Sequence, residues 1–289
     1  MKFLLTAINA KFIHSNPAIY SLRAGVGEKL QPYVELAEFT INESLESILE
    51  GIWKRQPKVI GFSCYIWNWK LIREILTELP KILPDTEIWL GGPEVTYDGP
   101  GLLREFPQVT GIMVGEGEVT FREVLEQYLR EAETAGQSEQ QPESDSTEHQ
   151  VADRRGTVAG KSMVERFGQI PGLCLASGYT APRDLTDLTT LPFLYEDMEP
   201  FTNRIIYYET SRGCPYRCSY CLSSIDKKVR LRDISVVKRE LQFFLDQNVK
   251  QVKFIDRTLN CDHKHAMEIW RYIYEHDNGV TNFHFEISA

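Results

Sequence analysis

The feature that most constrains the fold is a regular alternation of short apolar runs with amphipathic helical segments from residue 1 to about 130. This alternation is typical of a doubly wound parallel sheet with helices on both faces. The second apolar run places Glu35 and Glu38 among apolar neighbours, which indicates an edge strand, and the flavodoxin-like order 2-1-3-4-5 puts it there. Strands are predicted at residues 2–8, 34–40, 59–64, 87–90 and 111–114.

Small and polar residues gather where the third, fourth and fifth of these strands end. They are Ser63, Gly91, Gly92, Gly115, Glu116 and Gly117. In a doubly wound sheet a ligand binds beyond the carboxyl ends of the strands. Glycine allows the backbone to approach such a ligand closely. The sequence therefore predicts a ligand site along this edge. Thr120 and Glu123 form a capping-box pattern, which predicts the start of the next helix.

The middle of the chain changes character. Residues 131–168 are rich in Glu, Gln, Ser, Ala and Gly, with almost no large apolar side chains, and are predicted to form a disordered linker. Residues 169–203 are expected to be a connector, with one short strand at residues 170–176. We therefore expect a first domain at residues 1–130 and a second one after the connector.

The strand–helix alternation restarts in the last part of the chain. Residues 204–289 contain three predicted strands, at 205–210, 252–256 and 282–288, and two predicted helices, at 236–246 and 264–276. This pattern fits the first part of a (β/α) barrel. Three strands cannot close a barrel, so we expect the natural protein to continue beyond residue 289.

Composition limits the classes of function. The formal charge of −9 gives no general electrostatic footprint for nucleic acid. No apolar run reaches the roughly 18 residues that a membrane span needs, so no membrane partner is expected. Six cysteines without a signal peptide indicate metal or redox chemistry in a reducing compartment, and the cytoplasm is the expected location.

Three of the cysteines carry the strongest motif. Cys214, Cys218 and Cys221 have CxxxCxxC spacing and follow a predicted strand directly. Three thiolates on one loop can ligate three irons of a four-iron cluster and leave the fourth iron open. A zinc site is the alternative, but zinc ligands usually come as two CxxC-like pairs, and the next histidine is the distant His263. A purely structural role for the cysteines is the other alternative.

The run SRGCPYRCSYC at residues 211–221, placed after a strand, resembles the radical S-adenosylmethionine (radical SAM) superfamily. This resemblance implies a 4Fe-4S cluster on the three cysteines, which cleaves S-adenosylmethionine reductively for radical chemistry or methyl transfer. It also implies a reducing partner such as flavodoxin or ferredoxin. Tyr220 matches the aromatic position near the adenine. Asp256 and Asn260 match a second-strand pattern near the cofactor, and a cap on the following helix is the alternative role for either residue.

The first domain resembles the cobalamin (B12)-binding domain found in one branch of that superfamily. The resemblance rests on GGPEVT at residues 91–96 and GEGEVTF at residues 115–121. It implies cobalamin contacts from the strand-end residues named above. The Asp-x-His-x-x-Gly motif that supplies a cobalt ligand in methionine-synthase-type domains is absent. His14, in the loop after the first strand, is the only candidate ligand there, and a hydrogen-bonding role is the alternative.

Together these features predict a cobalamin-binding radical SAM enzyme that performs methyl transfer or radical rearrangement on an unknown, small-molecule or other, substrate. Two alternatives are kept. One is a non-catalytic module that binds an iron–sulfur cluster or cobalamin. The other is a transfer-RNA methylthiotransferase, but that family carries three cysteines in its first domain, whereas residues 1–130 hold only Cys64.

Overall fold

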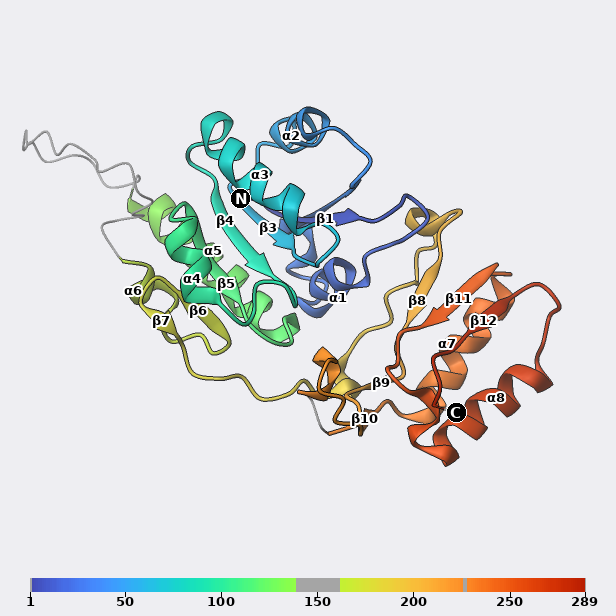
Figure 1. Ribbon diagram of the computed structural model, residues 1–289. Coiled ribbons are helices and arrows are strands. Elements are labelled where there is room, and N and C mark those ends of the chain that lie inside the picture. Colours follow the sequence, from blue (N-terminus) through green and yellow to red (C-terminus); the bar gives the residue numbers. More distant parts are fainter. Residues whose placement is uncertain (1, 139–161, 226–227, 289) are drawn as a thin grey trace, which may run out of the picture. The chain divides into compact units, whose positions relative to one another are not determined.

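The structure is a computed structural model that describes residues 2–138, 162–225 and 228–288 (Figure 1). Two compact units make up the chain. The first consists of Met1–Lys11 and Ala18–Thr186, and the second of Phe12–Pro17 and Asp187–Ala289. No helix among the described residues is long and apolar enough to cross a membrane.

The first unit is built on a sheet with the order β2-β1-β3-β4-β5-β6-β7. Strands β1 to β5 pair in parallel, which confirms the predicted flavodoxin-like arrangement with β2 at the edge. Strand β1 is buried along its whole length, as a central strand covered on both faces requires. The bounds are β1 (Phe3–Asn9), β2 (Val34–Thr40), β3 (Val59–Ser63), β4 (Glu87–Gly91), β5 (Val109–Met113), β6 (Leu173–Leu175) and β7 (Gly178–Tyr179).

Helices cover both faces of this sheet and enclose two apolar cores. One core joins the strands to α2 (Leu45–Trp53), α3 (Trp69–Ile82) and α4 (Gly99–Glu105). The other joins them to α1 (Pro17–Gly25), α5 (Glu118–Ser138) and α6 (Met163–Phe167). The strands alternate their side chains between the two cores, so Leu4 and Ile8 face the first and Phe3 and Leu5 the second.

The first unit extends further along the chain than the sequence predicts. Strand β6 pairs antiparallel with β5, and β7 pairs antiparallel with β6. Leu173 and Leu175 belong to the core of the second face, which explains why this segment groups with the sheet. Residues 169–186, which we expected in a connector, are therefore part of the first unit, which does not end at residue 130.

Both described ends of the predicted linker, residues 131–138 and 163–167, are helical. Helix α5 continues to Ser138, and α6 begins at Met163 after a capping box formed by Ser162 and Glu165. Their polar composition indicated disorder, but both segments contain residues that favour helices, such as Glu, Ala and Arg. The rest of the predicted linker, residues 139–161, lies outside the described residues.

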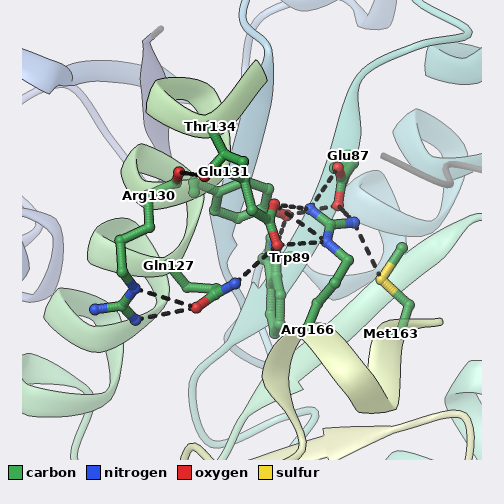
Figure 2. Close-up of polar contacts among 9 residues, drawn as sticks. Glu87, Trp89, Gln127, Arg130, Glu131, Thr134, Met163 and Arg166 are labelled. Carbon is green, nitrogen blue, oxygen red and sulfur yellow. Dashed lines mark hydrogen bonds and ion pairs between the residues drawn. The ribbon is translucent and has the colours of Figure 1, made fainter. Parts of the chain in front are cut away.

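A buried ion-pair network attaches α6 to the sheet (Figure 2). The Arg166 guanidinium donates to both carboxylate oxygens of Glu87 on β4, at 3.0 Å each, and to both of Glu131 on α5, at 2.9–3.2 Å. Tyr128 donates to Glu87 at 2.6 Å and accepts from the Trp89 indole at 2.8 Å. Burial lowers the pKa of Arg166, but the bonds to Glu131 and Glu87 raise it above its ordinary value.

The predicted capping box of Thr120 and Glu123 is wrong. Helix α5 begins at Glu118, so both residues lie inside its first turns. Arg183 binds them instead: its Nε donates to Thr120 Oγ1 at 2.7 Å, and its guanidinium pairs with Glu123. The polar pattern that resembles a cap in the sequence therefore holds the segment after β7 against α5.

The second unit contains a parallel sheet with the order β12-β11-β8. This is the strand–helix pattern expected of a partial (β/α) barrel, with α7 and α8 as the crossover helices. A two-stranded antiparallel sheet pairs β9 with β10. The bounds are β8 (Ile206–Tyr208), β9 (Ser211–Arg212), β10 (Arg230–Leu231), α7 (Ile234–Asp246), β11 (Gln251–Phe254), α8 (His263–Glu275) and β12 (Asn282–His284). Short 3-10 helices are η1 (Gln31–Tyr33), η3 (Leu188–Thr190), η4 (Glu199–Phe201), η5 (Leu222–Ser224) and η6 (Leu259–Cys261).

Candidate functional site

The cysteine motif lies on a loop of the second unit whose two ends are paired. Strand β9, just before the motif, pairs antiparallel with β10, just after it. The amide of Arg232 donates to the carbonyl of Thr210 at 2.8 Å and closes the pairing. We call residues 210–212 and 230–232 the neck of the cysteine loop. Gly213 follows the first strand of the neck with φ of 96°, and a Cβ there would lie 2.4 Å from the Lys228 carbonyl oxygen, so this tight turn requires glycine.

The three cysteines differ in exposure. Cys214 is buried, with its Sγ 4.0 Å from Thr258 Oγ1, whereas Cys218 and Cys221 are exposed. The amide of Cys221 donates to the carbonyl of Cys218 at 3.1 Å. Among the described residues, no three His, Cys, Asp or Glu side chains lie together as a metal site. The thiols thus fit an iron–sulfur cluster by their chemistry and their place on one short loop, and not by a gathered geometry.

The residues predicted to contact S-adenosylmethionine are placed differently from one another. Tyr220 is 91% exposed on the cysteine loop. Asp256 follows β11 and is fully buried, and its carboxylate accepts bonds from Thr210 and Ser211. Burial raises the pKa of Asp256, although these bonds favour its charged form. Asn260 exchanges hydrogen bonds at 2.9 Å with the backbone of Ser288. Neither caps a helix, because Asp262 is the N-cap of α8.

A second buried carboxylate supports the neck, and the sequence analysis missed it. Glu240 on α7 accepts two hydrogen bonds from the Arg232 guanidinium, at 2.7 and 2.8 Å, and one from the Tyr208 hydroxyl at 2.7 Å. The sequence pattern around Glu240 does contain a signal for this buried role. Val237, Leu241 and Phe244 are buried on the same helix, so Glu240 is an acidic residue within the apolar face of an amphipathic segment.

The residues predicted to contact cobalamin from the strand ends come together in the first unit. Ser63 ends β3 and pairs in register with Gly91, which ends β4, and Gly91 pairs with Met113, which ends β5. Gly92 follows with φ of 108°, and Gly115 follows β5 with φ of 81°. Parallel strands bring their carboxyl ends to one edge, which is where doubly wound sheets bind ligands. The Glu116 carboxylate accepts a hydrogen bond from the amide of Thr186 at 2.6 Å.

Gly92 is expected to tolerate no side chain. A Cβ would lie 2.5 Å from the carbonyl oxygen of Cys64, whose amide is held by Gly91 at 2.7 Å. We expect Gly92→Ala to lower the free energy of unfolding by about 1–2 kcal/mol through backbone strain and by about 1–3 kcal/mol more through the steric clash. Urea denaturation measures the sum of the two contributions.

Gly115→Ala is the matched control, because Gly115 also has a positive φ but nothing lies within 4 Å of its Cβ position. It should show the strain alone. Equal destabilisation by the two substitutions would contradict the predicted clash with Cys64.

His14 is not among the residues of the first unit, although it follows β1. Residues Phe12–Pro17 group with the second unit. The carbonyl of Ile13 accepts from the amide of Ile205 at 2.9 Å, and His14 Nδ1 lies 2.5 Å from the Tyr207 hydroxyl on β8. The structure shows His14 in the hydrogen-bonding role, with Nδ1 bound to the Tyr207 hydroxyl. Cobalt ligation by His14 stays a prediction.

Comparisons with known proteins agree with a ligand-binding domain in the first unit and a cysteine motif in the second. Residues 4–125 match the family model of the B12 binding domain. A 2-(S-pantetheinyl)-carbapenam-3-carboxylate methyltransferase from Streptantibioticus cattleyicolor is 28% identical over 74% of this chain and 29% of its own length. The cobalamin-dependent radical SAM methyltransferase TokK from Streptomyces tokunonensis is 26% identical over 70% of this chain and 27% of its own length.

A solved structure shows the same fold. The cobalamin-dependent S-adenosylmethionine radical enzyme OxsB, with aqua-cobalamin and S-adenosylmethionine bound, matches 98% of this chain and 38% of that one, with a TM-score of 0.67 at 15% identity. The chain thus spans less than half the length of these relatives.

Most of the first unit matches a B12-binding domain, over residues 4–125. The second unit is a partial (β/α) unit and carries the CxxxCxxC motif. The chain thus carries a B12-binding domain match and is similar to cobalamin-dependent radical SAM methyltransferases.

Proposed function

We propose that this chain forms the cofactor-binding part of a cobalamin-dependent radical SAM enzyme that transfers a methyl group or rearranges its substrate. Cys214, Cys218 and Cys221 would hold a 4Fe-4S cluster, which when bound supplies the electron for reductive cleavage of S-adenosylmethionine. The observation that carries the proposal is the CxxxCxxC loop directly after the first strand of a parallel sheet, behind a B12-binding domain.

The chain's own residues have defined tasks in this proposal. The paired neck presents the three thiols on one loop, and the exposed Tyr220 ring offers an apolar face to the adenine. The strand ends of β3, β4 and β5 provide small residues against which cobalamin can lie. The substrate, a flavodoxin or ferredoxin as reducing partner, and a cytoplasmic location belong to the proposal as well.

The alternative of a methylthiotransferase is the less favoured one, although a putative methylthiotransferase from Methanocaldococcus jannaschii is 25% identical over 63% of this chain and 33% of its own length. The first unit contains two cysteines, Cys64 and Cys174, and both are buried. Burial raises the pKa of each thiol, so neither is prepared to serve as a thiolate ligand of an additional cluster.

Anaerobic reconstitution of the full-length protein with iron and sulfide tests the proposal. Absorption and electron paramagnetic resonance (EPR) spectra should show a 4Fe-4S cluster whose signal changes when S-adenosylmethionine is added. Reduction should then yield 5′-deoxyadenosine or S-adenosylhomocysteine. A reconstituted cluster with neither product would favour the non-catalytic module, and absence of a cluster would refute the proposal.

Gly91→Ala tests the cobalamin part separately. A Cβ at Gly91 meets only Met113, at 3.8 Å, which is ordinary packing distance, and the backbone φ is not positive. We therefore expect the folding stability to be unchanged within about 0.5 kcal/mol. Cobalamin affinity should fall about tenfold or more, because a methyl group would occupy the place of close approach. Titration followed by absorption measures the affinity, and unchanged affinity would place the ligand elsewhere.

A further inference from the structure

Asp256 is fully enclosed and has three hydrogen-bond donors around its carboxylate. Oδ2 accepts from the amide of Thr210 at 3.0 Å. Oδ1 accepts from the hydroxyl of Thr210 at 2.6 Å and from the hydroxyl of Ser211 at 2.5 Å. All three donors belong to the first strand of the neck. The Asp256 carboxylate, just after β11, therefore fixes the backbone and side chains directly before the cysteine motif by hydrogen bonds.

Thr210 is held from both sides. Its amide and hydroxyl bind Asp256, while its carbonyl accepts from the amide of Arg232 on the other strand of the neck. Arg232 is in turn held by the buried carboxylate of Glu240. The two strands of the neck thus have one buried carboxylate each, and both carboxylates are fixed in the core of the second unit.

The same turn after β11 also reaches the first cysteine. Thr258 follows Asp256 by two residues, and its hydroxyl lies 4.0 Å from Cys214 Sγ. Cys214 is the buried member of the triad, so its thiol position depends on the neck below it and on this turn beside it. A shift of Asp256 would move both supports at once.

We propose that Asp256 is a positioning residue that fixes the neck of the cysteine loop, and with it Cys214, and that it does not contact S-adenosylmethionine through its side chain. The inference rests on the proposed cluster-binding function. Both oxygens of this buried carboxylate accept hydrogen bonds, and the side chain is costly to move because every bond that opens leaves a buried polar group unpaired. Contact with a cofactor would require this fully enclosed side chain to move and to open bonds to the neck.

Asp256→Asn in the full-length protein tests this role. The amide keeps the size of the side chain, but it removes the negative charge and leaves a single acceptor oxygen for three donors that two oxygens served before. Without any cluster, hydrogen exchange of the neck amides should accelerate by about tenfold or more, as expected for the loss of a bond to a charged acceptor. After reconstitution, the release of iron to a chelator in the absence of S-adenosylmethionine should accelerate by a similar factor.

Two further variants separate positioning from general destabilisation. Ile269→Val shortens a fully buried side chain on α8, outside the neck residues, and should lower stability without changing neck exchange or iron release. Ser211→Ala removes one of the three donors and should give an intermediate acceleration of both.

The outcomes distinguish the two proposals. Unchanged neck exchange in Asp256→Asn would overturn the positioning role. Normal iron retention combined with weaker S-adenosylmethionine binding would also overturn it and make Asp256 a cofactor contact. If the wild-type protein takes up no cluster, the proposed function fails, while faster exchange in the variant would still establish that Asp256 holds this loop.

Discussion

Replacement of Cys214, Cys218 and Cys221 together by alanine is expected to remove essentially all iron that the reconstituted protein binds. The three thiolates are the only ligands that the motif provides, and a cubane cluster without them has no covalent attachment. Iron and sulfide content, the visible absorption band and the EPR signal of the reduced protein measure the loss. S-adenosylmethionine should then produce no change in any of these spectra.

The fold should survive this substitution. Cys218 and Cys221 are exposed, and the neck below the loop is held by Asp256 and Glu240 and not by the thiols. Circular dichroism should therefore match the wild type. Cys261→Ala is the control, because Cys261 is half-buried and lies outside the motif, so its loss should leave the iron content unchanged. A triple variant that retains the cluster signal would show that the ligands lie elsewhere.

The first unit was largely predictable from the sequence, because its central strands are buried on both faces and appear as continuous apolar runs. Strand β2 was recognisable as an edge by Glu35 and Glu38. The antiparallel pair β6 and β7 was not assigned to this sheet. Its strands are two or three residues long, and their pairing with β5 joins segments separated by the whole of α5 and α6. No local pattern carries that information.

The site shows the same division. The cysteine triad and the strand-end glycines were found because their chemistry and backbone requirements are local. The partners of Asp256 were not found, since Thr210 and Ser211 lie 46 and 45 residues away in sequence. A polar residue at the end of a barrel strand reads equally as a cofactor ligand or as a support for a neighbouring loop. Only the positions of its donors distinguish the two.

The position of His14 was also beyond the sequence. The loop after the first strand of a doubly wound sheet normally belongs to that sheet's ligand edge. In this chain the backbone of Ile13 and the ring of His14 instead bind Ile205 and Tyr207 of the second unit. The pairing joins residues 193 positions apart, so the sequence could offer His14 only as a candidate from its residue type.

Replacement of Arg166 by methionine is expected to destabilise the first unit strongly. The guanidinium is fully buried between Glu87 and Glu131, which it binds through both of their carboxylates (Figure 2). Removal of one partner from a buried ion pair typically costs about 3–5 kcal/mol, because a charge is left uncompensated. Here two carboxylates lose their cation. Urea denaturation followed by circular dichroism should show the loss in the transition of the first unit.

Arg73→Met gives the matched control for this prediction. Arg73 binds both carboxylate oxygens of Glu105, but the two side chains are 40% and 45% exposed. An exposed pair of this kind contributes about 0–1 kcal/mol, since water solvates either charge when its partner is removed. If the two substitutions cost the same, the network around Arg166 would not be buried as described. The helix α6 (Met163–Phe167) is too short to be stable by itself, so it depends on its contacts with the rest of the unit. A large difference between the two substitutions would show that buried ion pairs to β4 and α5 supply these contacts.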